Sequence, residues 1–434
     1  MGSIPRTAFV HIGAPKTGTT AIQAAFASRK AQVTAAGFHY LDGGRNHSER
    51  LAVAFWDAED ARRLGKFRWI DDPAEFSAYR ARVREELHDE LERHSSHHLI
   101  ISGEELCAFS PGEAARFLDF LRPIFEDIRI IAYARDPQDW ITSAAQQGTK
   151  WSGDLLETAF AAPRLPMYQN RFQPYREAVG DGSFDLRVFR APASGFDVVT
   201  DFAQAVGLKD AELSGAAHEN RAVSHRTTMV YSALNAWQPP FVDWHHNPFR
   251  AFRLIEDARL PGRAFTLPRE TVEAALPALR QEVDWVQSVA RTVKFEATKL
   301  PEIGYDDWFG GETDQIISFA ETLARNCGQA QNELALKSFL RAKACRRSDP
   351  GLAARLLSDA ALLATDRWTL HLIAQEAVEI EHPDRKKFFA KQRLMRRLED
   401  PEPADPEVGV GNPFDRAWLL PNAGGEVAGA IKVA

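Results

Sequence analysis

Thr7-Ala-Phe-Val-His-Ile-Gly13 is followed directly by Ala14-Pro-Lys-Thr-Gly-Thr-Thr-Ala-Ile-Gln23, so a strand-like run meets a Gly/Pro turn and then the start of a helix. Such a junction directs free backbone N–H groups and the positive end of a helix dipole at one point, which suits a phosphate or a sulfate. Lys16 adds a positive charge to this point, and three threonines add hydroxyl donors: Thr17, Thr19 and Thr20. The stretch therefore predicts an anion site directly after a first strand.

The position of the lysine separates this loop from a Walker A loop. A Walker A loop reads G-x-x-x-x-G-K-[ST], with Lys after the second glycine and next to a Ser or Thr that holds magnesium. Here Lys16 precedes Gly18 by two residues. The alternative interpretation is a plain turn with helix-capping threonines. We favour the anion site because glycine, Pro15, Lys16 and the threonines all stand where such a cradle would use them.

The first half of the chain alternates short β-branched and aromatic runs with helical patterns, which indicates βα units around a mainly parallel sheet. The predicted strands are Ala8–Gly13, His98–Ser102, Ile128–Ala134 and Phe184–Arg190, and the predicted helices are Pro73–His94, Gly112–Phe125 and Asp197–Val206. The run 128–134 is nearly continuously apolar, as expected of a central strand covered on both faces. The expected fold class is α/β, a central mainly parallel sheet flanked by helices.

From about Ser224 onward only helical patterns occur, so we expect an α-helical C-terminal extension. The predicted helices are Thr227–Trp237, Arg269–Arg291, Thr313–Asn326, Glu333–Arg346, Leu352–Ala364, Arg367–Ile380 and Lys386–Arg397. Within the last four, the first and third are offset by about the 34 residues of a tetratricopeptide unit, but without its side-chain signature a plain helical bundle is favoured. We therefore divide the chain into an α/β unit (1–300), a helical region (301–398) and a Pro/Gly-rich tail (399–434).

Charge and composition exclude several classes of protein. The 434 residues include 53 Lys+Arg and 60 Asp+Glu, a net charge of −7, so the chain lacks the broad basic field of a nucleic-acid binder. Three cysteines without paired spacing argue against a disulfide framework and a Cys-ligated zinc site. With no apolar run of roughly 18 residues and no visible secretory signal, we expect a soluble, cytoplasmic protein without a transmembrane segment.

A second phosphate-binding pattern follows the strand 128–134. The chain continues as Arg135-Asp-Pro-Gln-Asp-Trp-Ile-Thr-Ser143, with Arg and Ser eight positions apart. The Arg135 guanidinium can fork onto a phosphate, and Ser143, on a helix beginning near Pro137, can donate to the same group. The alternative for Arg135 is a surface ion pair with Asp136 or Asp139, which we rank lower.

The two patterns together resemble the sulfotransferases that use 3′-phosphoadenosine 5′-phosphosulfate. That family carries Pro-Lys-[Ser/Thr]-Gly-[Ser/Thr]-[Ser/Thr] after its first strand, and an Arg at a later strand end with a Ser eight positions on. The usable resemblance spans residues 7 to about 225. It is nearest to bacterial sulfotransferases that modify carbohydrates, because the segments 11–13, 37–47 and 101–106 have similar-looking counterparts there.

The resemblance implies a P-loop-like sulfotransferase fold, this donor without a metal ion, and a saccharide or glycoconjugate as acceptor. It implies that the loop from Pro15 to Thr20, Gly18 included, holds the 5′-phosphosulfate and that Arg135 and Ser143 hold the 3′-phosphate. The chain also departs from the family. Ala21 stands where the cytosolic enzymes for phenols and steroids carry a Trp against adenine, and their late Arg-Lys-Gly segment is replaced by Asn220-Arg-Ala-Val-Ser-His-Arg226, in which Arg221 is the candidate second 3′-phosphate ligand.

Sulfuryl transfer requires a cation at the bridging oxygen and a base for the acceptor proton. Lys16 is the expected cation. Glu104 and Glu105 directly follow the strand 98–102 and are the first candidates for the base, although acidic residues there also suit a helix N-terminus. His47, in the polar loop 42–47, is the rival base.

The other histidines near the predicted strands are His11, His97 and His98. His11, among apolar neighbours, suits a hydrogen-bonded core histidine at least as well as a catalytic one, and the His97-His98 pair has no metal-site spacing. Two alternative functions remain open, a P-loop small-molecule kinase and a non-catalytic, nucleotide-binding helical scaffold. The sequence does not give the acceptor's identity or the oligomeric state.

Overall fold

The structure is a computed structural model of the whole chain. It describes residues 6–57, 72–190, 195–208, 223–237, 241–242, 245–246, 260–290, 295, 298–309, 313–364, 367–380 and 382. Three predictions lie outside these residues: Arg221, the helix 386–397 and the tail 399–434.

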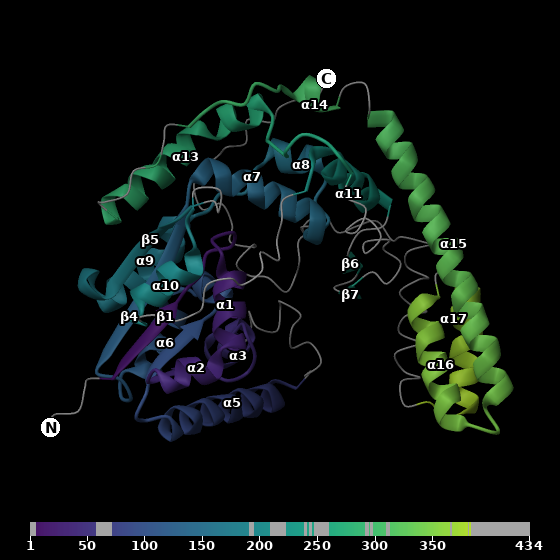
Figure 1. Cartoon of the computed structure of the whole chain (residues 1–434), viewed down its shortest axis with the longest axis horizontal. Helices are drawn as coiled ribbons and strands as arrows, with labels where there is room; N and C mark the ends of the chain where they lie inside the picture. Colours follow the sequence, from purple (N-terminus) through teal and green to yellow (C-terminus); the bar gives the residue numbers. More distant parts are fainter. Residues whose placement is uncertain are drawn as a thin grey trace.

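Five parallel strands form one sheet in the order β2-β3-β1-β4-β5 (Figure 1). Their bounds are β1 Thr7–His11, β2 Phe38–Tyr40, β3 His98–Ser102, β4 Asp127–Arg135 and β5 Phe184–Phe189, and a separate antiparallel pair is β6 Phe241–Val242 and β7 His245–His246. The first strand of the chain is therefore the central one, between β3 and β4. The predicted α/β fold class is confirmed, and all five strands of the sheet run parallel.

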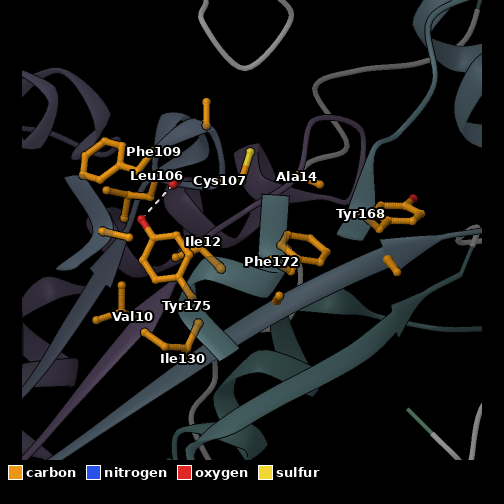
Figure 2. Packing of buried hydrophobic residues seen from close by; sticks show 14 of the residues in the cluster. Val10, Ile12, Ala14, Leu106, Cys107, Phe109, Ile130, Tyr168, Phe172 and Tyr175 are labelled. Carbon is orange, nitrogen blue, oxygen red and sulfur yellow. Dashed lines mark hydrogen bonds between the residues drawn. The ribbon is translucent and has the colours of Figure 1, made fainter. Parts of the chain in front are cut away.

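Alternate side chains of the central strands enter two different cores. Val10 and Ile130 belong to the larger core cluster on one face of the sheet, while Phe9 and Ile131 belong to the smaller cluster on the other. Figure 2 shows Val10 and Ile130 packed beside Tyr175 in the larger cluster. Because both faces are covered, the strands can be apolar almost throughout.

The helices cover the two faces unequally. The bounds in the first part of the chain are α1 Thr19–Ser28, α2 Lys30–Ala35, α3 Ser48–Phe55, α5 Pro73–Arg93, α6 Pro111–Leu121, α7 Pro137–Gln147, α8 Leu156–Ala161, α9 Tyr168–Val179 and α10 Val198–Ala205. Helices α1, α2 and α10 pack on the smaller face, and α3, α5, α6, α7, α8 and α9 contribute to the larger core. This arrangement leaves the carboxyl ends of the strands to the loops.

The rest of the described chain is mainly helical, but the expectation of helices alone after about Ser224 is wrong, because the short antiparallel pair β6–β7 lies in this part of the chain. The bounds are α11 His225–Trp237, α13 Arg269–Val289, α14 Tyr305–Phe309, α15 Thr313–Cys345, α16 Pro350–Leu363 and α17 Arg367–Glu379. Helices α13 and α14 pack into the larger core of the sheet, whereas α15, α16 and α17 share a core of their own that includes Phe339 and Leu357. In Figure 1 this last group stands to the side of the sheet, and α15 reaches α11 through Ala320.

Besides β6 and β7, the helix α15 and the strand β2 differ from the predictions. The expected break between 326 and 333 does not exist, since α15 is one helix of 33 residues that runs through Cys327 and Gly328. A single glycine costs a helix only about 1 kcal/mol, which packing against neighbouring helices offsets. Strand β2, at the sheet edge, has only three residues and gave no strand signal. Among the described helices, none combines the length and apolar composition that a bilayer crossing needs.

Candidate functional site

The strand order opens the sheet between β1 and β4. The connection after β1 leads toward β2, past β3, while the connection after β4 leads the opposite way, to β5. Neighbouring strands whose connections diverge leave a crevice at their carboxyl ends, where open α/β sheets bind ligands. Lys16 follows β1 and Arg135 ends β4, so the two sequence patterns meet at this point.

The loop after β1 turns its backbone toward one site. Lys16 and Gly18 have φ values of 68° and 84°, both left-handed, and Gly18 is the N-cap of α1 without any side-chain cap. The backbone N–H groups of residues 16–20 donate to no acceptor in the described part of the chain. Unbonded N–H groups at a helix N-terminus form an anion-binding cradle.

The hydroxyls of Thr17 and Thr19 differ in their hydrogen bonding. The hydroxyl of Thr17 donates to the carbonyl oxygen of Ala14 over 2.7 Å, so its proton closes the loop. Thr19 is only 3% exposed, and its Oγ1 has no hydrogen-bond partner among the residues described. Such an unpaired hydroxyl is costly in a folded core, and a bound anion would satisfy it. Thr20 is half-buried.

Neighbouring elements fix the loop in place. The indole N–H of Trp140, on α7, donates to the carbonyl oxygen of Pro15 over 2.7 Å. A Cβ on Gly13 would lie 2.4 Å from Thr19 Oγ1, and a Cβ on Gly18 would lie 2.8 Å from the Phe189 ring. The two glycines therefore allow the loop to pack directly against α1 and β5.

Four charged side chains act on one another at the mouth of this loop. Burial lowers the pKa of Lys16 to about 8; the Glu104 carboxylate opposes this shift, and the cations of Arg135 and Lys150 add to it. Lys16 and the two cations that act on it outnumber the one carboxylate, which leaves an excess of positive charge. An arriving anion would neutralise that excess and raise the pKa of Lys16 again.

Lys150 belongs to the site although no sequence pattern pointed to it. It lies on the π-helical turn Gly148–Ser152, which extends α7. The side-chain amide of Asn235 donates to the carbonyl oxygen of Thr149 over 2.7 Å and so ties this turn to α11. The neighbouring Trp151 is 42% exposed, and the Lys150 ammonium is 5.0 Å from the centre of its ring. A π-turn at this position is the only local signal, because such turns gather at functional sites.

Arg135 is held by its backbone. The Tyr168 hydroxyl donates to the carbonyl oxygen of Arg135 over 2.7 Å and accepts from its N–H over 2.9 Å. The guanidinium is 5.8 Å from the Phe189 ring centre and 3.8 Å from a carboxylate oxygen of Asp139. An exposed pair at that distance contributes little, so the ion pair does not prevent a phosphate contact. Ser143 is half-buried, two turns further along α7.

The two glutamates after β3 lie on one short 3-10 helix, Glu104–Ala108, but in different environments. Glu104 is half-buried and its charge reaches Lys16. Glu105 is 5% exposed, and its backbone N–H donates to Ser48 Oγ over 3.0 Å. Figure 2 shows why the turn is rigid, since the Tyr175 hydroxyl donates to the Leu106 carbonyl oxygen over 2.8 Å. Of the two carboxylates, Glu104 is the one in electrostatic contact with the loop cation.

The two histidines near β1 are buried and neutral. His47 Nδ1 accepts from the Ser102 backbone N–H over 3.0 Å, and His11 Nδ1 lies 2.9 Å from Ser102 Oγ. Burial lowers the pKa of each to about 3. His11 is the core histidine that its neighbours in the sequence predicted. His47 is the N-cap of α3 and is 1% exposed, so its lowered pKa follows from its burial.

Comparisons with protein-family models, with curated proteins and with solved structures give no match to this chain.

Proposed function

We propose that the chain is a sulfotransferase with a P-loop-like sulfotransferase fold, which moves a sulfuryl group from 3′-phosphoadenosine 5′-phosphosulfate to an acceptor hydroxyl. The S–O bond to the 5′-phosphate breaks, a new S–O bond forms to the acceptor oxygen, and the acceptor proton goes to a base. The products are a sulfate ester and 3′-phosphoadenosine 5′-phosphate. No metal is required.

The observation that supports the proposal is that the charges of Arg135 and Lys150 reach Lys16, in a loop whose backbone N–H groups make no hydrogen bond within the described residues. A donor with charge at both its 5′ and 3′ positions needs cations on two sides. In the proposal, Lys16 neutralises the charge on the bridging oxygen. The Thr19 hydroxyl, which has no partner among the described residues, donates a hydrogen bond to the 5′-phosphosulfate. Arg135 and Ser143 bind the 3′-phosphate, with Arg221 as the further ligand that the motif suggests.

Glu104 is the proposed base. A carboxylate beside the loop cation lies where the acceptor hydroxyl must approach the sulfuryl group, and general-base catalysis contributes roughly 100- to 10,000-fold to a rate. Glu105 and His47 are the alternatives. A carbohydrate acceptor is supported by the exposed Trp151 ring next to Lys150, because aromatic faces stack on sugar rings.

Calorimetric titration of the full chain tests the proposal. We expect 3′-phosphoadenosine 5′-phosphate to bind without metal, and adenosine 5′-phosphate to bind more weakly. Arg135→Ala should remove most of that difference, since a charge-assisted phosphate contact is worth about 1.5 to 3 kcal/mol, or about ten- to a hundred-fold. Arg129→Ala is the matched control, because Arg129 lies on the same strand at the opposite end of the sheet.

The same titration separates the other candidate functions. Binding of magnesium-ATP in preference to the bisphosphate would assign the site to a small-molecule kinase. Nucleotide binding that needs neither the 3′-phosphate nor a metal would favour the nucleotide-binding helical scaffold, and failure of both ligands to bind would contradict all three functions. Equal loss of both adenosine ligands in Arg135→Ala would remove the 3′-phosphate role from Arg135.

A further inference from the structure

A second cluster of ligating side chains lies away from the strand ends that carry Lys16 and Arg135. His39 is in the edge strand β2, Asp42 follows this strand, and His94 is the C-cap of α5. One donor atom from each of the three lies within 4.8 Å of the other two. No sequence spacing brought these residues together, and no metal was predicted from the sequence.

The hydrogen bonds of His39 leave one ring nitrogen for a ligand. His39 Nε2 is 2.7 Å from Glu90 Oε1, the Asp42 N–H donates to the same oxygen over 2.6 Å, and Arg50 pairs with Glu90 Oε2. Both carboxylate oxygens of Glu90 therefore face donors, Oε1 the Asp42 N–H and Oε2 the Arg50 guanidinium. Glu90 is thus a carboxylate acceptor, so Nε2 carries the hydrogen.

His39 Nδ1 consequently presents a lone pair. The side chain is 1% exposed, and Nδ1 has no hydrogen-bond partner among the residues that the structure describes. A histidine that donates one N–H to a carboxylate and aims its other nitrogen at an ion is the usual arrangement around protein metals. His94 is the second imidazole, since its ring stacks on that of His39 and one of its nitrogens lies within 4.8 Å of the donor atoms of His39 and Asp42.

The surroundings favour a cation. A pocket of about 830 Å³ beside the cluster is lined by five carboxylates and only two guanidinium groups: Asp42, Glu86, Asp89, Glu90 and Glu92 with Arg50 and Arg93. Such a lining gives the pocket a negative potential, which concentrates cations.

We propose that His39 Nδ1, His94 and Asp42 bind one divalent transition-metal ion such as Zn²⁺, with Glu90 as the carboxylate that orients His39. Two imidazoles and a carboxylate suit Zn²⁺, and water completes a four-coordinate site. The ion ties the end of β2 to the end of α5.

Binding requires two local adjustments. The rings of His39 and His94 are stacked, with centroids 3.8 Å apart and planes 7° apart, so their in-plane lone pairs lie in nearly parallel planes and do not meet at one point. The half-buried His94 turns so that both lone pairs meet at the ion. Lys30, which is ion-paired with Asp42, is exchanged for the metal.

The test uses the full chain without a histidine tag, freed of metal with a chelator and titrated calorimetrically with Zn²⁺. We expect one Zn²⁺ per chain and a higher melting temperature with Zn²⁺ present. His94→Ala and Asp42→Asn should each weaken binding at least about tenfold, and Glu90→Gln about 10- to 100-fold. The control is His97→Ala, which changes a neighbouring histidine outside the cluster and should leave the affinity unchanged.

Three outcomes would overturn the site. The first is the lack of a one-to-one Zn²⁺ complex in the wild type. The second is an equal loss in His94→Ala and His97→Ala. The third is Mg²⁺ binding as tightly as Zn²⁺ while His94→Ala leaves both affinities unchanged. The ions would then bind the carboxylates of the acidic pocket and not the histidines. Circular dichroism and bisphosphate binding verify that each variant is folded, independently of the metal.

Discussion

Lys16 has a left-handed backbone, and burial lowers the pKa of its ammonium. Both features oppose folding, since a non-glycine residue at positive φ is strained and a charge loses solvation on burial. Neither is explained by packing. A bound anion explains both, because the left-handed turn directs the backbone N–H groups and the ammonium at the same point.

Bisphosphate affinity should therefore depend on Lys16 and on pH. The pKa of Lys16 is about 8, so the side chain is charged below this pH and neutral above it. We expect affinity to be constant below pH 8 and to fall as the pH rises through that value. Lys16→Met should bind weakly at every pH and lose this step. Calorimetry from pH 6.5 to 9 measures the affinities of the wild type and of Lys16→Met. If the affinity of Lys16→Met still falls near pH 8, the fall is due to another titratable group.

The same pKa predicts the effect of Lys16 on stability. Its folded-state pKa lies below the value of 10.5 for an unfolded lysine, so the unfolded chain holds more protons between about pH 8 and 10.5. The contribution of Lys16 to the free energy of unfolding accordingly rises across that window. At pH 7 we expect Lys16→Met to be at least as stable as the wild type in urea unfolding. A clear loss of stability would show that Lys16 has a structural role.

The choice of base is tested by single substitutions. Glu104→Gln should keep the donor affinity and lower the transfer rate by roughly 100- to 10,000-fold, whereas Glu105→Gln should change the rate much less. Rates are measured against pH with an identified carbohydrate acceptor. With a pKa of about 3, His47 does not produce an acid limb near pH 6.5. An active Glu104→Gln alongside an inactive His47→Ala would transfer the role to His47.

At the scale of elements, the turn into α1 depends on Gly18. A Cβ there would lie 2.8 Å from Phe189 and 2.9 Å from Val198, at a φ of 84°. We expect Gly18→Ala to displace the loop and to reduce bisphosphate affinity more than tenfold. Gly207→Ala is a matched control, since Gly207 has a φ of 83° but open space around it. Equal effects of the two substitutions on binding would mean that contact with Phe189 and Val198 is unimportant.

The end of β4 depends on one hydroxyl of α9. Tyr168→Phe removes both hydrogen bonds to the backbone of Arg135 and leaves the ring in the core. Losing these hydrogen bonds should lower the free energy of unfolding by on the order of 1 to 3 kcal/mol. It should also reduce the preference for 3′-phosphoadenosine 5′-phosphate over adenosine 5′-phosphate. The measurement compares the two adenosine ligands in this variant and in Tyr175→Phe, whose hydroxyl bonds to Leu106 instead. A similar loss of selectivity in both would argue against positioning through Arg135.

The sequence predicted the site residues that depend on local patterns and missed those that depend on contacts between distant elements. Lys16 and Arg135 were found because an apolar run ends in a polar residue, and adjacent strands bring such ends together. Lys150 was missed because its position depends on a π-turn held by Asn235 from α11. The His39 and His94 cluster was missed for a similar reason, since only the packing of α5 beside β2 brings it together. Local sequence patterns predict residues at strand ends, whereas residues placed by contacts between distant elements are not predictable from such patterns.

At the scale of the whole molecule, α14 is part of the larger core. Trp308 is 2% exposed, and its ring centre lies 5.1 Å from that of Phe160 and 5.3 Å from that of Phe265. Trp308→Ala should therefore lower the free energy of unfolding by about 3 to 5 kcal/mol. Leu300→Ala, at a 44% exposed residue of the preceding segment, should change it little. Similar unfolding midpoints for both variants in urea would contradict this assignment.

The central place of β1 also has a consequence for biosynthesis. Thr7 pairs with Asp127, which is made 120 residues later, and β3 lies between them in the chain. At 5 to 20 residues per second, the ribosome needs about 6 to 24 s to supply that partner. Until β3 is made both edges of this apolar strand lack a partner, and until β4 is made one edge still does; such a segment aggregates or recruits chaperones. A stalled chain that ends before β4 is consequently a substrate for quality control rather than a smaller folded protein.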